Sequence, residues 1–376
     1  MPEQILDEVI LNKARRALQE LRVDAALLDE QTTIAWITGY ASQVIHGPNP
    51  FEAGGPLLWL DNDRVILLVS DAEQPPAAAS GAETITYAGY QIDGPLRPVE
   101  AMLDAFENLM ATVSRPRRLG IENLPIRFWH AICKRWSDLE IDGISGWTSG
   151  IRAVKTPAEI DRIRAACRLS SLAQAALRNT ELLNRTELDL FDTILLAMEQ
   201  EAGTRLTVLA DLVAGIRTAG IGGIPTIYRV QPDNPVLADV VPRLAGYWGD
   251  ICNVHFAGQA SVPLRSAYQA VRTALFETIN AARPGRRANE LDQIARRTIE
   301  QHGFTSHPHH TGHGIGVACH EEPRICGYND TRLEPGMVIA LEPGIYQESA
   351  GGVRLEHVIL ITDNDPQILT EHTMEI

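Results

Sequence analysis

Histidines are concentrated in one short segment of the chain. Six of the 11 lie between positions 302 and 320, namely His302, His307, His309, His310, His313 and His320. A single loop histidine is most often solvated or hydrogen-bonded, whereas a group of them can bind a metal ion or transfer protons near neutral pH. In the stretch HHTGHGIGVACHEEP, glycines alternate around His313 and allow close approach of the backbone. The pattern indicates that His313 is held against a buried centre.

Four carboxylates follow or interrupt apolar segments. Asp239 follows the run PVLA, and Asp250 lies 250 − 239 = 11 residues later, after a Tyr-Trp pair. Glu342 ends the run GMVIAL, and Glu356 is expected inside a second apolar strand, GGVRLEHVILIT. Carboxylates that converge in an apolar interior repel one another and become neutral unless counter-charge is supplied.

Two divalent cations would supply that counter-charge. Four negative charges balance two such ions, which leaves neutral His313 as a further ligand and a bridging hydroxide as the nucleophile. Four oxygens and one nitrogen suit Mn²⁺, Co²⁺, Fe²⁺ or Zn²⁺. The alternative is that the four acids belong to separate surface turns or strand edges, as most Asp and Glu residues do.

The elements that would position these residues fall into two predicted domains, because 376 residues exceed the usual size of one hydrophobic core. Residues 1–150 are predicted to form an α/β domain. It has a helix near 3–21 and short strands in AALLDE, TIAWITG, PLLWL, RVILLVS, TITYAGY and RLGIE. After the stretch GISGWTSG, Thr156 can cap a helix whose first turn takes Pro157. We place the domain boundary there.

Residues 151–376 are predicted to form an α+β domain. Its helices are expected near 156–179, 186–202, 264–282 and 288–302. The segments PVLADVV and GYWGDICNVHFAG are joined by a short connection. An antiparallel pair is therefore favoured, because a parallel crossover needs a dozen or more residues.

Composition and net charge exclude several classes of function. A formal charge of −15 and a pI near 5.2 oppose binding to nucleic acid or to an anionic membrane through a basic face. The charged, amphipathic N-terminus lacks a signal-peptide core, and no apolar stretch reaches the roughly 18 residues of a membrane span. A cytoplasmic protein is expected. The five scattered cysteines argue against a disulfide framework or a thiolate zinc site.

The ordered set Asp239, Asp250, His313, Glu342 and Glu356 lies in DVVPRLAGYWGD, HTGHGIGVACHEEP, LEPGIY and GVRLE. This pattern resembles the pita-bread metallopeptidases, which include creatinase and proline-specific aminopeptidases and dipeptidases. IRAVKTPAEIDRIRAACRLS is similar to the entry of the family's catalytic domain, and DEQTTIAWITGY to its accessory domain. The resemblance implies a creatinase-type N-terminal accessory domain over 1–150 and a pita-bread catalytic domain with an antiparallel sheet over 151–376.

The resemblance also implies a division of roles among the five ligands. Asp239 would bind one metal, His313 and Glu342 the other, while Asp250 and Glu356 would bridge both. The metals implied are Mn²⁺ or Co²⁺, with Zn²⁺ or Fe²⁺ as alternatives. Glu342 would also accept and relay the proton of the attacking water.

Three further side chains are expected beside the metals. The resemblance implies that His320 and His309 donate to the developing gem-diolate or position the substrate. Arg354 precedes Glu356 by two residues, so strand alternation puts both on one face, where Arg354 can orient a metal carboxylate or the substrate. The alternative for Arg354 is a surface position.

Several positions depart from the family's pattern. Gly222 stands where many family peptidases carry a substrate-handling histidine. Cys252 and Asn253 replace the common Thr-Arg pair, and His357 follows Glu356 where Asp or Asn is more usual. Such changes can alter substrate choice without abolishing metal binding. For Cys252 a packed thiol is favoured over a nucleophile.

Three functions remain open from the sequence. The first is a metal-dependent hydrolase of an Xaa-Pro peptide or similar imide bond, acting as a homodimer whose N-terminal domain restricts long substrates. The second is a hydrolase of a small non-peptide amide or amidine, resembling the creatinase or ectoine hydrolase branches. The third is a non-catalytic binding protein with the same fold. Turnover of Xaa-Pro dipeptides separates the first two, and metal content separates both from the third.

Overall fold

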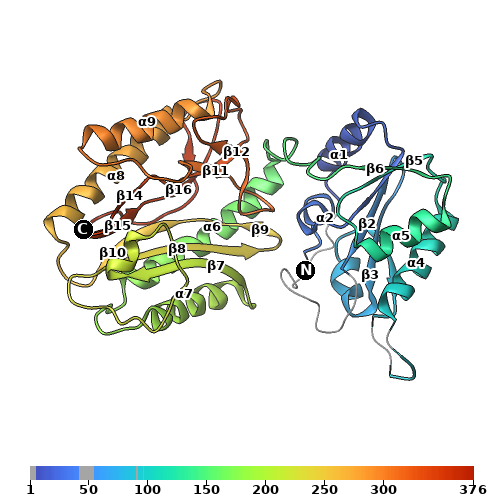
Figure 1. Cartoon of the computed structure of the whole chain (residues 1–376), viewed down its shortest axis with the longest axis horizontal. Helices are drawn as coiled ribbons and strands as arrows, with labels where there is room; N and C mark the ends of the chain where they lie inside the picture. The colour runs from blue at the N-terminus through green and yellow to red at the C-terminus, as the bar shows by residue number, and fades with distance from the viewer. Residues whose placement is uncertain (1–5, 42–54, 90–91, 96) are drawn as a thin grey trace. The chain divides into compact units, whose positions relative to one another are not determined.

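The computed structural model describes residues 6–41, 55–89, 92–95 and 97–376 (Figure 1). The chain divides into two compact units, Met1–Ile151 and Arg152–Ile376. Among the described helices, none is both long enough and apolar enough to cross a membrane.

The first unit is built on a mixed sheet of six strands in the order β4-β3-β2-β1-β5-β6. The pairs β1–β2 and β2–β3 are antiparallel, and the outer pairs are parallel. Its strands are β1 (Ala25–Leu28), β2 (Leu57–Asp61), β3 (Val65–Ser70), β4 (Glu83–Tyr87), β5 (Arg118–Ile121) and β6 (Glu140–Gly143). Its helices are α1 (Glu8–Glu20), α2 (Gln31–Thr38), α3 (Gln74–Ala78), α4 (Pro98–Thr112) and α5 (Ile126–Arg135), besides the 3₁₀ turn η1 (Asp71–Glu73).

Two predictions for this unit need comment. The helix predicted near 3–21 begins at Glu8, capped by Asp7, and residues 3–5 lie outside the described part of the chain. The strand predicted in TIAWITG is wrong, because these residues form α2. Every side chain from Thr33 to Thr38 is buried, and a short run that is apolar on all sides fits a helix as well as a strand. Gly39, at φ 71°, ends the helix in the left-handed conformation.

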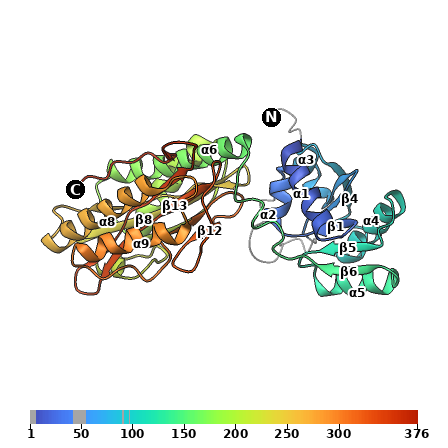
Figure 2. The same cartoon turned by 90° about the horizontal axis from the view of Figure 1, so that it is seen from above.

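The second unit contains two helix pairs. They are α6 (Pro157–Arg178) with α7 (Glu187–Ala202), and α8 (Val262–Ala281) with α9 (Ala288–Gln301). The predicted start of α6 is confirmed, since the Thr156 side chain accepts from Glu159 N and the Glu159 side chain accepts from Thr156 N. Helices α6 and α7 pack on β7 and β8, whereas α8 and α9 pack on β12, β13 and β15 (Figures 1 and 2).

Three sheets lie between these helices. One has β10-β8-β7 with β9 beside β8, the second has the order β12-β11-β13-β16-β17, and the third is the pair β14-β15. The bounds are β7 (Thr207–Ala214), β8 (Pro235–Leu244), β9 (Tyr247–Trp248), β10 (Cys252–Phe256), β11 (Gly312–Gly314), β12 (Glu321–Ile325), β13 (Val338–Leu341), β14 (Gly344–Gln347), β15 (Gly351–Arg354), β16 (His357–Leu360) and β17 (Gln367–Ile368), with the 3₁₀ turn η2 (Gly215–Ala219) after β7. All recorded strand pairs of this unit are antiparallel, including the predicted pairing of β8 with β10.

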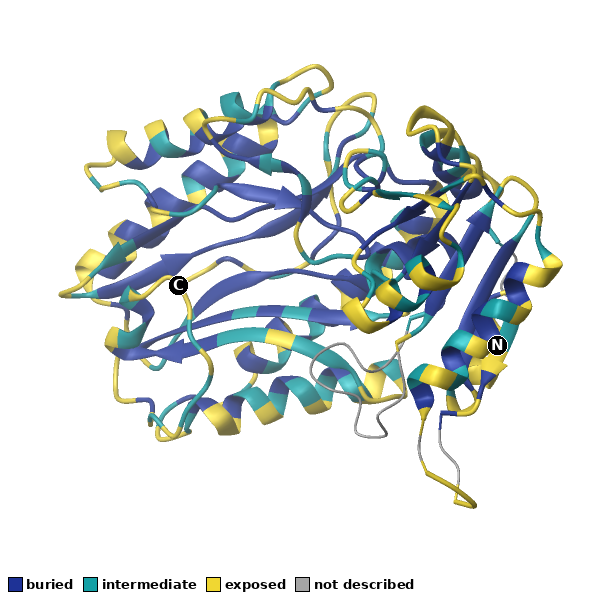
Figure 3. Ribbon diagram, turned by 45° about the vertical axis from the view of Figure 1, so that its right-hand side comes forward, coloured by how far each residue is buried: buried dark blue, intermediate teal, exposed yellow. Residues whose placement is uncertain are grey.

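The strands of the second unit are buried on both faces over much of their length, and the helices are striped (Figure 3). One apolar cluster joins α8 and α9 to β13, β15 and β16, and another joins α6 and α7 to β7 and β8. A carboxylate or imidazole carried by an inner strand end is therefore removed from water. Burial of this kind shifts the pKa values of the polar residues at the candidate metal centre.

Candidate metal centre

Two of the predicted ligands lie on or next to the paired strands β8 and β10. Asp239 lies on β8, opposite Cys252 of β10 and Asp211 of β7. Asp250 precedes β10 and is 3% exposed. Between them Gly249 allows the chain to touch α6, since a Cβ there would lie 2.6 Å from the backbone nitrogen of Cys167. The strand pairing thus brings both carboxylates to the same inner position.

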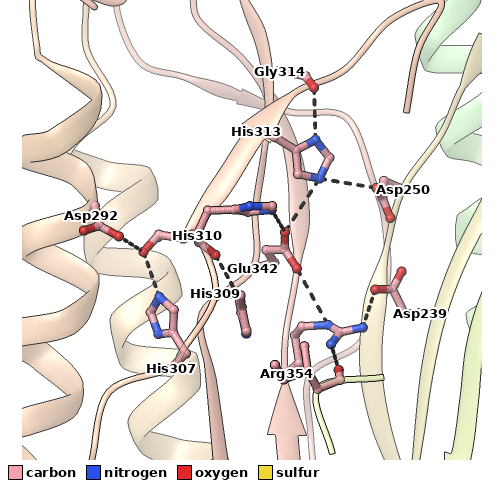
Figure 4. Close-up of polar contacts among 12 residues, drawn as sticks. Asp239, Asp250, Asp292, His307, His309, His310, His313, Gly314, Glu342 and Arg354 are labelled. Carbon is pink, nitrogen blue, oxygen red and sulfur yellow. Dashed lines mark hydrogen bonds and ion pairs between the residues drawn. The ribbon is translucent and has the colours of Figure 1, made fainter. Parts of the chain in front are cut away.

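His313 is the central residue of β11 and is 1% exposed. A Cβ on Gly312 would lie 3.0 Å from the Ala340 carbonyl carbon, and one on Gly314 would lie 2.6 Å from that of Glu322. The close backbone approach expected from the alternating glycines is therefore confirmed. His313 Nδ1 donates to Gly314 O over 3.0 Å, so its Nε2 faces the centre (Figure 4).

Glu342 follows β13, and its backbone nitrogen donates to Thr311 O over 2.8 Å. Its Oε1 lies 3.6 Å from His313 Nε2, which is also 3.7 Å from Asp250 Oδ2 (Figure 4). Glu356 was expected inside a strand, and this is wrong: it lies in the break between β15 and β16. Its backbone nitrogen donates to Cys252 O, so the chain leaves the β14–β15 ladder and turns the carboxylate inward.

The buried oxygens at this point lack hydrogen-bond partners. Asp239 Oδ1, Asp250 Oδ1 and both oxygens of Glu356 are inaccessible and unpaired. Ligand atoms of Asp250, His313 and Glu356 lie within 4.8 Å of one another. Buried carboxylates without donors are costly, and a cation is the group that satisfies several of them at once. The residues present thus fit a centre for divalent metal ions bound by oxygen and imidazole.

The pKa shifts of the buried carboxylates also indicate a site for added positive charge. Burial, with Asp239 and Glu342 nearby, raises the pKa of Asp250 well above its ordinary value. Burial, followed by Asp250 and Asp239, does the same to the pKa of Glu356. The pKa of Asp239 is raised to about 6 by burial, against the opposing effect of Arg354. The acids therefore repel one another in the absence of added positive charge.

Glu342 and His313 are held in the forms that bind a cation. Burial alone would raise the pKa of Glu342, but His310, His313 and Arg354 outweigh it and the pKa is lowered. Burial lowers the pKa of His313 to about 3, so the imidazole is neutral at ordinary pH.

The structure places Arg354 inside the site, not on the surface. Its side chain is 3% exposed, and Nη2 lies 2.5 Å from Asp239 Oδ2 and 3.1 Å from Asp211 Oδ2. Nε lies 3.7 Å from Glu342 Oε2. The guanidinium therefore contacts two of the predicted metal carboxylates, Asp239 and Glu342.

The two predicted catalytic histidines differ in their surroundings. The His320 ring centroid is 3.9 Å from that of His313, and His320 is exposed. His309 Nδ1 donates to His310 O over 2.7 Å, so its Nε2 accepts from the Tyr346 hydroxyl over 2.9 Å. Arg354 donates to the same hydroxyl over 3.3 Å. His309 thus reaches the centre through Tyr346.

His310 contacts the predicted ligands directly, and the sequence argument did not single it out. Its Nε2 donates to Glu342 Oε1 over 3.0 Å (Figure 4). The only signal in the sequence was the adjacent pair His309-His310. An irregular loop carries no periodicity that tells which of two neighbours turns inward.

Helix α9 holds the loop that carries these histidines. Arg296 donates to the carbonyl oxygens of His307 and His309, over 2.6 and 2.7 Å, and to both oxygens of Asp292. Asp292 also accepts from the Thr311 hydroxyl over 2.6 Å, which is in turn 2.8 Å from His307 Nε2. The loop backbone is therefore fixed by a partly buried ion pair.

A cavity of about 510 Å³ opens beside the centre. The predicted ligands Asp239, Asp250, His313 and Glu342 line it together with His320 and Asp211. Its apolar wall is formed by Phe191, Val208, Leu209, Ile224, Pro225 and Val241. A substrate of dipeptide size can thus place one apolar part against this wall and a polar group against the centre.

Three residues that depart from the family's pattern, Cys252, Asn253 and His357, are not among the predicted metal ligands. Cys252 is buried as expected, and desolvation raises the pKa of its thiol well above the ordinary value. Asn253 donates to Thr373 O over 3.2 Å, and His357 Nδ1 lies 2.8 Å from the Thr370 hydroxyl. These two side chains contact the C-terminal segment rather than the predicted ligands.

The fold and the site define a metal-dependent hydrolase with an antiparallel catalytic sheet. The sequence model of the metallopeptidase family M24 matches residues 161–363, and that of the creatinase/prolidase N-terminal domain matches residues 10–154. The chain belongs to metallopeptidase family M24.

Similar proteins agree with this assignment. The chain is 26% identical over 368 residues to an Xaa-Pro dipeptidase of Pyrococcus furiosus, covering 97% of this chain and 99% of that protein. It is 30% identical over 262 residues to an Xaa-Pro dipeptidase of Pyrococcus horikoshii, covering 69% and 75%. The crystal structure of a prolidase from Pyrococcus horikoshii superposes with a TM-score of 0.82 at 25% identity, covering 97% and 99%. The expected creatinase-type and pita-bread architecture is confirmed.

Proposed function

We propose that this chain is a dinuclear metallohydrolase that cleaves Xaa-Pro dipeptides or short Xaa-Pro peptides. The observation that carries the proposal is the set of buried, unpaired oxygens on Asp239, Asp250 and Glu356 that face His313 and Glu342. Similarity over nearly the whole chain to proteins named Xaa-Pro dipeptidase supports the substrate class.

In this proposal the five residues would hold two divalent cations, and the resemblance implies that Asp250 and Glu356 would be shared ligands. The resemblance favours Mn²⁺ or Co²⁺. When bound, such ions polarise the scissile carbonyl and lower the pKa of water, which supplies the nucleophile at neutral pH. The four carboxylates would balance the added charge, which relieves the mutual repulsion described above.

The protein's own groups then handle protons and orientation. Glu342 is the proposed proton carrier, because the resemblance implies this role and its carboxylate lies at the centre beside His313 and His310. His320 lines the cavity and is proposed to donate to the oxygen on which charge develops. His309 is proposed to act through Tyr346, which holds Arg354 against Asp239.

The apolar wall of the cavity supports an Xaa-Pro substrate, because a pyrrolidine ring or an aliphatic side chain buries apolar surface there. We further propose a homodimer located in the cytoplasm, with residues 1–150 as the accessory domain and 151–376 as the catalytic one. Light scattering on the purified protein tests the dimer.

One observation favours a second candidate, the hydrolysis of a small amide or amidine with a cationic group. Asp211 lines the cavity, and its side chain is 37% exposed. An acid at this place attracts a cationic nitrogen in a substrate. Gly222 lies next to the Asp211 carboxylate and has no side chain that could contact a peptide.

The experiment is hydrolysis of a panel of Xaa-Pro dipeptides and small amides by metal-loaded protein, with metal content determined on the same sample. Turnover of Xaa-Pro peptides with about two metals per chain is expected. Two metals with turnover of only the small amides would move the assignment to the second candidate. Glu356→Ala is expected to remove most bound metal and activity, whereas Glu348→Ala, at an exposed position, is the matched control. Full activity and unchanged metal content in Glu356→Ala would contradict the ligand assignment.

A further inference from the structure

Two sets of ligand atoms overlap at the centre and share His313. One consists of Asp250, His313 and Glu356, and the other of His310, His313 and His320. In each set the atoms lie within 4.8 Å of one another. The ring centroids of His310 lie 5.5 Å from His313 and 5.4 Å from His320. The second set therefore places three imidazoles where the five predicted ligands provide one.

His313 has only one nitrogen to offer to a metal. Its Nδ1 is occupied by the Gly314 carbonyl oxygen, and its Nε2 lies 3.6 Å from Glu342 Oε1. An ion at this nitrogen is therefore the ion next to Glu342. His310 Nε2 lies 3.0 Å from the same oxygen of Glu342, so it borders the same position.

We infer that His310 adds a nitrogen ligand to the ion held by His313 and Glu342, so that this chain selects Zn²⁺ or Co²⁺ over Mn²⁺. The inference rests on the proposed ligand set and goes beyond it by choosing among the metals. An imidazole-rich site suits Zn²⁺ and Co²⁺, whereas carboxylates and water suit Mn²⁺. The Irving–Williams order also gives most nitrogen and oxygen sites a higher affinity for Co²⁺ and Zn²⁺ than for Mn²⁺.

A simpler role for His310 is to orient Glu342 by a hydrogen bond. Loss of such a bond weakens the binding of every metal that Glu342 holds, whatever its ligand preference. Loss of a nitrogen ligand weakens Zn²⁺ much more than Mn²⁺. The ratio of the two affinities therefore separates the two roles, and it does not depend on catalysis.

The experiment is calorimetric titration of the metal-free full-length chain with Zn²⁺ and, separately, with Mn²⁺. His310→Ala removes the imidazole, and His310→Gln keeps an N–H donor for Glu342 but offers no imidazole. His302→Ala is the matched control, because His302 is exposed at the end of α9 and its Nδ1 contacts only Thr298 O among the described contacts. Thermal unfolding of each metal-free variant establishes that it is folded.

Wild type is expected to bind Zn²⁺ more tightly than Mn²⁺. His310→Ala and His310→Gln should both weaken Zn²⁺ by about tenfold or more while changing Mn²⁺ by less than about threefold. Equal weakening of both metals, or recovery of Zn²⁺ affinity in His310→Gln, would overturn the inference and leave the five-ligand centre in place. A wild-type chain that binds neither metal would overturn the five-ligand centre as well. None of these outcomes depends on a measurement of peptidase turnover.

Discussion

A Cβ atom on Gly222 would lie 2.5 Å from Cγ of Asp211, so the Asp211 carboxylate occupies the space that any side chain at position 222 would need. Asp211 is held there, because Gly223 N donates to its Oδ1 over 2.8 Å and Arg354 Nη2 contacts its Oδ2. Position 222, where the resemblance implies a histidine in many family peptidases, is therefore bordered in this chain by a carboxylate from β7.

The first prediction follows from this contact. Gly222→Ala should lower the free energy of unfolding by about 1–3 kcal/mol, because neither Asp211 nor the loop can yield without losing a hydrogen bond. In an Asp211→Ala background the same change should cost much less, which gives a measurable coupling energy. Urea unfolding of the four proteins measures it. Gly220→Ala is the control, since its Cβ would lie 3.4 Å from Arg217 O, much farther from its neighbour than a Cβ at position 222. Additive effects of Gly222→Ala and Asp211→Ala would contradict the contact.

The second prediction concerns Arg296, whose guanidinium joins Asp292 to the backbone of the histidine loop. Arg296→Lys keeps the charge but cannot make these contacts together, because an ammonium lacks the planar fork. We expect kcat to fall by about tenfold or more with KM little changed, since the loop positions His309 and His310 rather than the substrate's apolar part. Steady-state kinetics at saturating metal tests this.

Arg297→Lys, at the next position on α9, serves as the matched control for the same kinetics. A purely structural role for Arg296 would lower the amount of folded protein and leave kcat per active site unchanged. Titration of active sites by metal content distinguishes the two outcomes.

The third prediction is a pH dependence of stability caused by His307. Burial, with His309 and Arg296 nearby, lowers the pKa of its imidazole to about 3. Above about pH 6.5 neither state binds a proton here. As the pH falls below that value the unfolded chain takes up a proton and the folded chain does not, so the free energy of unfolding falls by up to about 1.4 kcal/mol per pH unit.

His307→Asn should therefore reduce the decrease in the free energy of unfolding between about pH 6.5 and 4.5 by roughly 2 kcal/mol. The measurement is urea unfolding of the metal-free protein at several pH values, since bound metal would add its own linkage. His302→Asn provides the comparison on an exposed histidine. An identical pH slope in wild type and His307→Asn would show that His307 is not excluded from protonation in the folded state.

Sequence patterns predicted the parts of this molecule that depend on local chemistry. The Thr156 cap, the antiparallel return from β8 to β10 and the close approach around His313 each follow from residue types within a few positions. They are confirmed because turns, caps and glycine contacts are decided by neighbours in the chain.

Other features depend on contacts between distant segments. The run that became α2 is buried on all sides, so only its packing decides between helix and strand. Glu356 lies in a break because its backbone pairs with Cys252, which is 104 residues earlier (356 − 252). The same holds for His310, whose inward orientation depends on Arg296 and on Glu342.

The last prediction concerns a buried ion pair that supports the loop carrying His320. Lys155 Nζ lies 3.2 Å from Glu321 Oε2, with side chains that are 1% and 2% exposed, and Arg152 lies 3.4 Å from the other oxygen. Glu321 Oε1 also accepts from Ala318 N, which fixes the turn before His320. Lys155→Met should cost about 3–5 kcal/mol, because it leaves a buried carboxylate short of one partner.

The same variant should also lower kcat, because the turn that Glu321 holds carries His320 into the cavity. Urea unfolding measures the stability, and steady-state kinetics on the folded fraction measures the turnover. Arg168→Met is the control: Arg168 and Glu201 form an exposed pair at 2.7 Å, and its loss should change stability by less than about 1 kcal/mol. If Lys155→Met is as mild as Arg168→Met, then Arg152 alone neutralises Glu321, and the pair with Lys155 contributes nothing measurable to the fold.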